Sequence, residues 1–369
     1  MSLHRRNLIL GILAAVLLLL AGATWLGVYW VMQTSATTTS IPVAPVIQNT
    51  NIDPAPVVVE PTEVARQTDG VLVEPAQAKL YPIAIMIENA AFGGVRPQSG
   101  LSFAQVVYEI VVEGGITRFM AVYAGNMPDV IGPVRSARPT YLEFASEYDA
   151  LYGHAGGSPE SLAAIAGLGM QDLSALGADS RFFYRDGSKV APHNLFTSSS
   201  LLSLARRDKG LDVTVAEFDS WVFKSDKKPD AKPETDVSLT VDFGSGPLYV
   251  AQYVYGYKNN AYSRWTAGEE QIDAVTGKPL EIKNVIVQVV PAAVAAGDEG
   301  RVNFNVTGEG KVYIARDGEV VEGTWKKADR LSRTLWYDAA GQEIALNRGA
   351  TWIAVLPETG TVDYIINEE

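Results

Sequence analysis

The sequence predicts an α+β protein in which an N-terminal α/β-type domain precedes an all-β domain of the sandwich or barrel type. Residues 83–87 form a short apolar run that is typical of a buried strand. Two later segments place a proline where a helix would begin, at Pro139 and Pro159, and a strand-like run lies between them. Beyond residue 237 the chain holds only short strand-like runs separated by turn residues. Strands and helices that alternate, followed by strands alone, are the basis of this prediction.

The N-terminal segment has the features of a membrane anchor. Residues 8–32 are almost wholly apolar and carry no charge. A helix of this length, with a rise of about 1.5 Å per residue, crosses a hydrocarbon layer of about 30 Å. Arg5 and Arg6 precede it, so the positive-inside rule places the N-terminus in the cytoplasm and the folded domains outside the cell membrane. We therefore expect a single-pass transmembrane helix over residues 1–33. A signal peptide cleaved near residues 21–23 is the alternative, which the continuing apolar run disfavours.

A polar segment separates this anchor from the first domain. Residues 34–79 are rich in Thr, Pro, Val and Ser and hold few aromatic side chains. Such a composition buries too little apolar surface to offset the entropy lost on ordering. The sequence therefore predicts an extended stalk over residues 34–79.

The first domain, residues 80–224, is predicted from alternating strand and helix signals. Residues 105–112 and 116–123 are strand-like and are joined at Gly114 and Gly115. Pro139 suits the first turn of a helix, residues 150–154 suit a strand, and Ser158 caps a helix that runs to residue 168. Residues 198–207 form one more predicted helix. This alternation is typical of an α/β arrangement.

The second domain is predicted to begin after a polar linker. The linker, residues 225–236, contains two lysine–proline pairs and has little apolar content. Residues 237–369 then hold short strand-like runs with turn signals such as Asp317-Gly318 between them. Such a pattern is typical of an all-β sandwich or barrel.

Composition excludes several classes of function. The formal net charge of −12 disfavours nucleic acid as a partner, because no basic stripe offsets the repulsion of phosphates. The chain has no cysteine, which excludes disulfides, thiolate nucleophiles and cysteine-ligated zinc. Its three histidines show no metal-ligand spacing, so we expect no metal and no cofactor.

Two turn-to-helix junctions carry the residues that point to a ligand. The first, residues 131–139, contains Arg135 and Arg138, and the second, residues 152–160, contains His154. A helix N-terminus offers unpaired N–H groups and partial positive charge, and arginine adds a planar fork of donors suited to carboxylate or phosphate. The sequence therefore predicts a pocket that binds an oxyanion. The expected ligand-binding residues are Glu109, Glu113, Arg118, Arg135, Ser136, Arg138, His154, Gly156, Gly157, Ser158, Arg185, His193 and Asn194.

Structural roles for the same residues remain open alternatives. Arg135 and Arg138 could pair with acids of the same domain, with Glu109, Glu113 and Glu143 as the available partners. Ser158 is more often a helix cap than a nucleophile. His193 could brace a turn together with its neighbour Asn194.

These motifs together resemble the YerB-like bacterial lipoproteins, a family without an established biochemical function. The resemblance covers residue 80 to the C-terminus and rests on Arg96-Pro97-Gln98, Tyr108-Glu109, residues 113–118, residues 132–138, His154 with residues 156–158, and Pro192-His193-Asn194, together with Tyr262-Ser263-Arg264, Asp273, residues 284–288, Gly349 and Trp352-Ile353. Two departures are the absent lipid-bearing cysteine and a family histidine expected close to Gln271. The resemblance implies an envelope location and a two-domain plan.

Three functions follow as expectations. The first is a membrane-anchored, extracytoplasmic protein that binds an anionic cell-envelope ligand, such as a peptidoglycan fragment or a phosphate-bearing polymer. The second is an envelope hydrolase or transferase that uses His154 or His193 as general acid–base. The third is a scaffold that docks another envelope protein, with the all-β domain as the docking surface.

Overall fold

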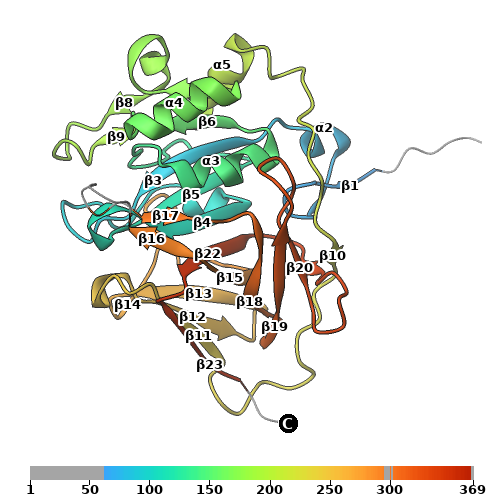
Figure 1. Cartoon of the computed structure of the whole chain (residues 1–369). Coiled ribbons are helices and arrows are strands. Elements are labelled where there is room, and N and C mark those ends of the chain that lie inside the picture. The colour runs from blue at the N-terminus through green and yellow to red at the C-terminus, as the bar shows by residue number, and fades with distance from the viewer. Residues whose placement is uncertain (1–61, 295–299, 301, 367–369) are drawn as a thin grey trace, which may run out of the picture. The chain divides into compact units, whose positions relative to one another are not determined.

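The computed structural model of this protein describes residues 62–294, 300 and 302–366, which belong to one compact unit (Figure 1). The predicted anchor at residues 8–32 and most of the predicted stalk lie outside the described residues. Within the described part of the chain, none of the helices is both long enough and apolar enough to cross a bilayer.

The largest element is a ten-stranded sheet with the strand order β20-β19-β18-β15-β22-β4-β5-β3-β6-β7. Its strands are β3 (Ile83–Glu88), β4 (Val106–Val111), β5 (Thr117–Tyr123), β6 (Leu151–His154), β7 (Asp172–Ser174), β15 (Asn284–Val290), β18 (Gly308–Arg316), β19 (Glu319–Lys327), β20 (Leu335–Tyr337) and β22 (Thr351–Pro357). The strands β15, β22, β4, β3, β6 and β7 share one direction, and β5 runs against its neighbours β4 and β3.

Both faces of this sheet are buried, which explains the continuous apolar runs of the central strands. Ile83, Ile85 and Ile87 of β3 point to one face, which we call the first face. Ala84 and Met86 point to the opposite, second face.

Helices and a smaller sheet cover these faces. The first face packs against α5 (Ser199–Asp208), η4 (Gly177–Phe182) and a five-stranded sheet with the order β14-β13-β12-β11-β23. The second face packs against α3 (Pro139–Ala145) and α4 (Pro159–Leu168). The strands of the smaller sheet are β11 (Ser238–Asp242), β12 (Ala251–Gly256), β13 (Ala261–Thr266), β14 (Glu269–Glu270) and β23 (Thr361–Ile365), at the bottom of Figure 1.

Short elements complete the described chain. They are β1 (Val64–Ala65), β2 (Leu72–Val73), α2 (Pro75–Ala78), η1 (Leu101–Phe103), η2 (Glu113–Gly115), η3 (Ser146–Tyr148), β8 (Tyr184–Arg185), β9 (Leu195–Phe196), β10 (Phe223–Lys224), η5 (Pro247–Tyr249), β16 (Ala292–Val294), β17 (Val302–Phe304) and β21 (Leu346–Asn347).

The fold is mixed α/β and rich in strands, as predicted, but the separate sandwich or barrel needs correction. Strand β22 pairs in parallel with β4, with Trp352 opposite Val107, so strands of the C-terminal half extend the N-terminal sheet. The remaining C-terminal strands form the smaller sheet and share one apolar core with the larger one. The two halves are thus built around a common sheet.

The predicted stalk also needs correction where it is described, because residues 62–79 are folded. Strands β1 and β2 pair with each other, and α2 follows them. The guanidinium of Arg66 lies 2.6 Å from the carboxylate of Asp69, and both residues are buried. The Asp69 carbonyl also accepts a hydrogen bond from the N–H of Gly349, so this segment is attached to the C-terminal half.

Candidate functional site

Two predicted site residues, Glu113 and His154, lie with the acid Glu88 where parallel strands of the large sheet end. Glu88 ends β3, Glu113 follows β4 closely, and His154 ends β6. Because β3, β4 and β6 run in the same direction, these ends lie at one edge of the sheet. In α/β sheets this carboxyl edge is where ligands bind most often.

Two arginines share the carboxylate of Glu113 at this edge. Nε of Arg138 donates to Glu113 Oε2 at 2.7 Å, and Nη2 of Arg138 donates to the other oxygen. Nη2 of Arg118 lies 3.6 Å from Glu113 Oε1, while its Nη1 donates to the carbonyl of Ser136 at 2.8 Å. Arg138 therefore pairs with an acid of its own domain, which was one of the structural alternatives, and that acid is Glu113.

Burial and the neighbouring charges shift the pKa values of Glu113 and Arg118. Burial raises the pKa of the Glu113 carboxyl, but the hydrogen bond from Arg138 and the charge of Arg118 outweigh burial and lower the pKa to about 2. Burial, followed by the charge of Arg138, lowers the pKa of Arg118 to about 10. Glu113 and Arg118 are therefore both ionised at neutral pH.

A second acid at the edge, Glu88, holds two further predicted site residues. Nε of Arg135 lies 3.1 Å from Glu88 Oε1, and Nδ1 of His193 lies 3.0 Å from both carboxylate oxygens. The His193 ring also meets the edge of Phe92, with 5.8 Å between centroids. Sequence reasoning did not identify Glu88, which carries no signal beyond its place at the end of an apolar run.

The carboxyl edge thus holds three guanidinium groups close to acidic side chains. Three guanidinium groups, those of Arg118, Arg135 and Arg138, face two carboxylates. A cleft of about 190 Å³ lies beside Arg138 and Glu113, and Ser158 and Glu160 also line it.

His154 lies at the same edge in a structural setting. Its side chain is fully buried, with Nδ1 2.7 Å from the carbonyl of Gly156 and Nε2 2.8 Å from Asp172 Oδ1. Both ring nitrogens are therefore occupied by oxygen atoms. In this arrangement His154 is not available as a general acid–base.

The turn before α4 also has a structural arrangement. The hydroxyl of Ser158 accepts a hydrogen bond from the N–H of Ser161 at 3.3 Å and caps the helix. The carbonyl of Gly156 accepts from Ala137, and Gly157 forms a bridge with the same residue. The cap interpretation of Ser158 is therefore the one observed.

Arg185 and Asn194 brace a loop. Nη1 of Arg185 donates to Asn194 Oδ1 at 2.6 Å, and the Asn194 amide donates to the Lys189 carbonyl at 3.3 Å. Their partners lie within residues 185–194, whereas Arg118, Arg135 and Arg138 are held by Glu113 and Glu88.

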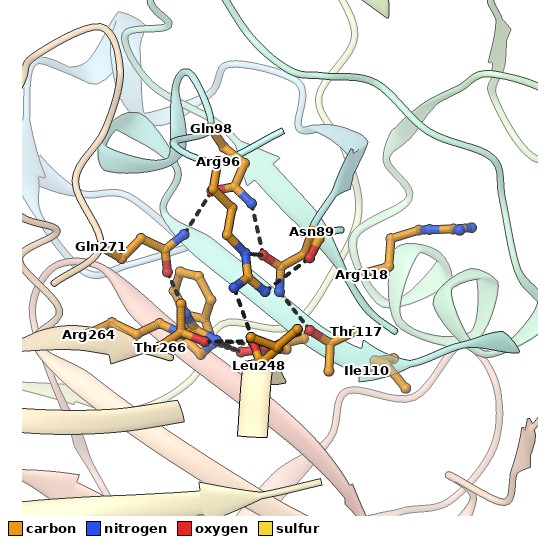
Figure 2. Close-up of polar contacts among 12 residues, drawn as sticks. Asn89, Arg96, Gln98, Ile110, Thr117, Arg118, Leu248, Arg264, Thr266 and Gln271 are labelled. Atoms are coloured by element: carbon orange, nitrogen blue, oxygen red, sulfur yellow. Dashed lines mark hydrogen bonds and ion pairs between the residues drawn. The ribbon is translucent and has the colours of Figure 1, made fainter. Parts of the chain in front are cut away.

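Glu109 lies on the first face of the large sheet, and its partner is not one of the arginines of the carboxyl edge. Nη2 of Arg264 donates to both Glu109 oxygens, at 2.7 and 2.9 Å, and both side chains are fully buried. Nε1 of Trp352 donates to Glu109 Oε2 at 3.1 Å. Figure 2 shows Arg118 directed away from Arg264 and its partners.

This ion pair is part of a closed ring of hydrogen bonds, which we call the polar ring (Figure 2). Its members are Asn89, Gln98, Glu109, Thr117, Arg264 and Gln271. Arg264 donates to Gln271 at 2.5 Å, Gln271 to Gln98 at 3.0 Å, and Gln98 to Asn89 at 2.9 Å. Asn89 then donates to Thr117 at 2.7 Å, and Thr117 donates to Glu109 at 2.9 Å.

Donors and acceptors alternate around the polar ring, so each link supports the next one. Arg96 joins it from outside, because its Nε donates to Asn89 Oδ1 at 3.0 Å. Sequence reasoning did not assign Arg96, Gln98 or Arg264 to a site. The only signal was their place in the motifs of the family resemblance.

The structure also bears on metals. Among the residues that the structure describes, no group of three His, Asp or Glu side chains is arranged to hold a metal ion.

Comparison with known proteins gives the family. Residues 68–212 match the N-terminal domain, and residues 239–353 the C-terminal domain, of the family described as "Protein of unknown function (DUF3048)". The chain belongs to the YerB-like DUF3048 family. It is 29% identical to the "Putative lipoprotein YerB" of Bacillus subtilis (strain 168) over 78% of this chain and 85% of that protein. It is also similar to the crystal structure of the YerB protein from Bacillus subtilis, with a TM-score of 0.70 and 26% identity over 80% of this chain and 98% of that chain.

The two matched domains of this DUF3048 protein contribute unequally to the groups described above. The arginines and acids of the carboxyl edge all come from the N-terminal domain. The polar ring takes Arg264 and Gln271 from the C-terminal domain and its other members from the N-terminal one. The polar ring is thus one of the features that join the two domains, together with the pairing of β22 and β4.

Proposed function

We propose that this DUF3048 protein is a membrane-anchored, extracytoplasmic protein that binds an anionic ligand of the cell envelope. The observation that carries the proposal is the cluster of three arginines at the carboxyl edge, of which Arg138 lines a cleft together with Glu113 and Glu160. The name of the Bacillus subtilis relative supports an envelope location. The apolar residues 8–32 would supply the anchor, in place of a lipid-bearing cysteine.

The arrangement of Arg138 and Arg118 favours anion binding in physical terms. Glu113 holds the guanidinium of Arg138 beside the cleft, so a ligand finds this group already positioned and little side-chain entropy is lost on binding. A carboxylate or phosphate group of the ligand would take up the donors that Glu113 does not use. Candidate ligands are a peptidoglycan fragment and a phosphate-bearing wall polymer.

A binding titration tests the proposal with two variants that should change the affinity in opposite directions. Arg138→Gln removes a donor, and we expect it to weaken binding of purified peptidoglycan fragments or wall polymer by about tenfold or more. Glu113→Gln keeps an acceptor oxygen for Arg138 but removes the negative charge that competes with the ligand, and we expect it to strengthen binding. Arg181→Gln is the matched control, because Arg181 is an exposed arginine paired with Asp208.

Circular dichroism of each variant separates binding from folding. If Arg138→Gln and Glu113→Gln both keep the fold and both bind as the unchanged protein does, the arginines have only a structural role. That result would overturn the proposal.

A second candidate, an envelope hydrolase or transferase, is favoured by the geometry of His193. A carboxylate that holds Nδ1 of a histidine orients Nε2 for proton transfer, and Glu88 is placed in this way at 3.0 Å. Turnover of purified cell-wall fragments that is lost in His193→Ala and retained in Arg181→Gln would decide for this function.

A further inference from the structure

A separate cavity of about 400 Å³ lies next to the polar ring. Arg96 and Gln98, which precede β4, form one part of its wall, and Gln271, which follows β14, forms another. Leu248 and Thr266 of the C-terminal domain complete the surroundings of Arg96 (Figure 2). The cavity is therefore built by both domains and is separate from the cleft at the carboxyl edge.

Arg96 is held in place at this cavity by neutral oxygen atoms. Its Nε donates to Asn89 Oδ1 at 3.0 Å, its Nη2 to the Asn89 carbonyl at 3.1 Å, and its Nη1 to the Leu248 carbonyl at 3.0 Å. The guanidinium also lies 5.2 Å from the ring centroid of Tyr249. These bonds use three of the five N–H donors of an arginine, and two are left for another partner.

No carboxylate lies within ion-pair distance of Arg96 in the described part of the chain. Arg96 forms no ion pair there, whereas Arg264 is matched by Glu109. The polar ring together with Arg96 therefore carries two guanidinium groups and one carboxylate. Burial, and next the charge of Arg264, lower the pKa of Arg96, and the charge of Glu109 offsets these effects only in part. An anion bound beside Arg96 would oppose both effects directly.

The cavity also has an acidic part and one further donor. Glu269 and Glu270 of β14 line it, and so does Gln271. The amide of Gln271 donates one N–H to Gln98, and its second N–H is left for a ligand. A ligand that satisfies all of these groups carries a negative group for Arg96 and a positive group for the two glutamates.

We propose that this cavity binds a small zwitterion of the amino-acid type, with its carboxylate on Arg96 and its ammonium group toward Glu269 and Glu270. The volume of about 400 Å³ lies in the range of small-molecule sites. Because the guanidinium is already fixed by three hydrogen bonds, binding a carboxylate costs little additional side-chain entropy.

Ligand-observed NMR on the full-length protein tests this site with defined probes. The probes are the twenty free amino acids and the dipeptide alanylalanine, with acetate and methylamine as singly charged controls. We expect at least one zwitterion to bind at millimolar concentration and both controls to bind at least about tenfold more weakly. If no zwitterion binds, or if acetate binds as well as the best zwitterion, the proposal is wrong.

Three variants separate the role of Arg96 from folding. Arg96→Gln should weaken binding of the best zwitterion by about tenfold or more. Ala91→Leu fills part of the cavity while it leaves Arg96 and its hydrogen bonds in place, so it should block binding without loss of the fold. Arg181→Gln, which changes an exposed arginine outside both sites, should leave this binding unchanged. Unchanged binding in Ala91→Leu would overturn the proposal even if Arg96→Gln does not fold.

Discussion

Arg264 donates two hydrogen bonds from one nitrogen to Glu109, at 2.7 and 2.9 Å, and neither side chain is exposed. The two residues lie 155 positions apart and come from the two matched domains of the chain. The ion pair fixes β13 of the smaller sheet over β4 of the larger one. It is also enclosed by aromatic rings, since the guanidinium lies 5.0 Å from the ring centroid of Trp352 and 5.5 Å from that of Phe119.

Removal of one partner of this ion pair should destabilise the protein strongly. Glu109→Gln leaves the guanidinium of Arg264 buried without a countercharge, and we expect a loss of about 3–5 kcal/mol in the free energy of unfolding. The double variant Glu109→Leu with Arg264→Met removes both charges, so it should recover much of that loss. Urea denaturation of the single and double variants measures both effects.

An exposed pair provides the matched control for this prediction. Lys326 and Glu309 lie 3.2 Å apart on the surface, with 54% and 66% of their side chains exposed. Glu309→Gln should change the free energy of unfolding by less than about 0.5 kcal/mol. A loss as large as that of Glu109→Gln would show that burial is not the source of the effect.

Stability in acid should depend on Glu113. Its folded-state pKa of about 2 lies below the ordinary value of 4.5, so folding favours the ionised carboxylate. The resulting stabilisation is complete above pH 4.5 and is lost as the pH falls from 4.5 to about 2. Glu113→Gln cannot ionise, so its free energy of unfolding should change less with pH in this window.

Thermal unfolding of both proteins between pH 2 and pH 7 measures the difference. We expect Glu113→Gln to be less stable at neutral pH, where Arg118 and Arg138 lose their shared carboxylate, and the two curves to converge in acid. Parallel curves over the whole range would contradict the prediction.

Local signals were sufficient to predict most single elements. The apolar run at residues 83–87 is strand β3, and the proline at position 159 opens α4, which ends at Leu168 as predicted. These patterns depend on neighbours in the chain, and the sequence shows such neighbours directly. The union of the two halves in one sheet has no such signal, because β22 and its partner β4 lie far apart in the chain.

The candidate site likewise could be predicted only where its residues carry a local signal. The turn-to-helix junction at residues 131–139 predicts Arg138 as a site residue, and its partner Glu113 belongs to the same predicted site. The polar ring was not predicted, because Gln98 and Gln271 are uncharged and 173 residues apart. Only the folded chain shows that these two amides link Arg264 to Asn89.

The two histidines of the folded part should differ in their effect on stability. His154 is fully buried between two acceptors, so His154→Ala leaves a cavity and removes the partner of Asp172, and we expect a loss of about 2–3 kcal/mol. His193 is 13% exposed, so His193→Ala should cost no more than about 1 kcal/mol. Chemical denaturation of the two variants gives both values, and the reverse order would refute the assignment of His154 as structural.

Arg333 should prove irreplaceable by lysine. It follows β19, and its guanidinium lies 3.7 Å from the ring centroid of Trp221 and 4.0 Å from that of Tyr148. Its Nη1 is 3.7 Å from Glu147 Oε2, and only 2% of its side chain is exposed. A planar guanidinium packs between two aromatic faces and still reaches the acid, whereas the ammonium group of lysine is compact and more strongly hydrated.

Because Arg333→Lys keeps the charge, it isolates the contribution of this planar geometry. We expect a loss of about 2 kcal/mol in the free energy of unfolding, measured by urea denaturation. Arg330→Lys is the control, because Arg330 pairs with Glu143 nearby while 40% of its side chain is exposed. If the two lysine variants lose the same stability, charge alone holds the β19–β20 connection to η3, and the packing of Arg333 between aromatic rings adds nothing.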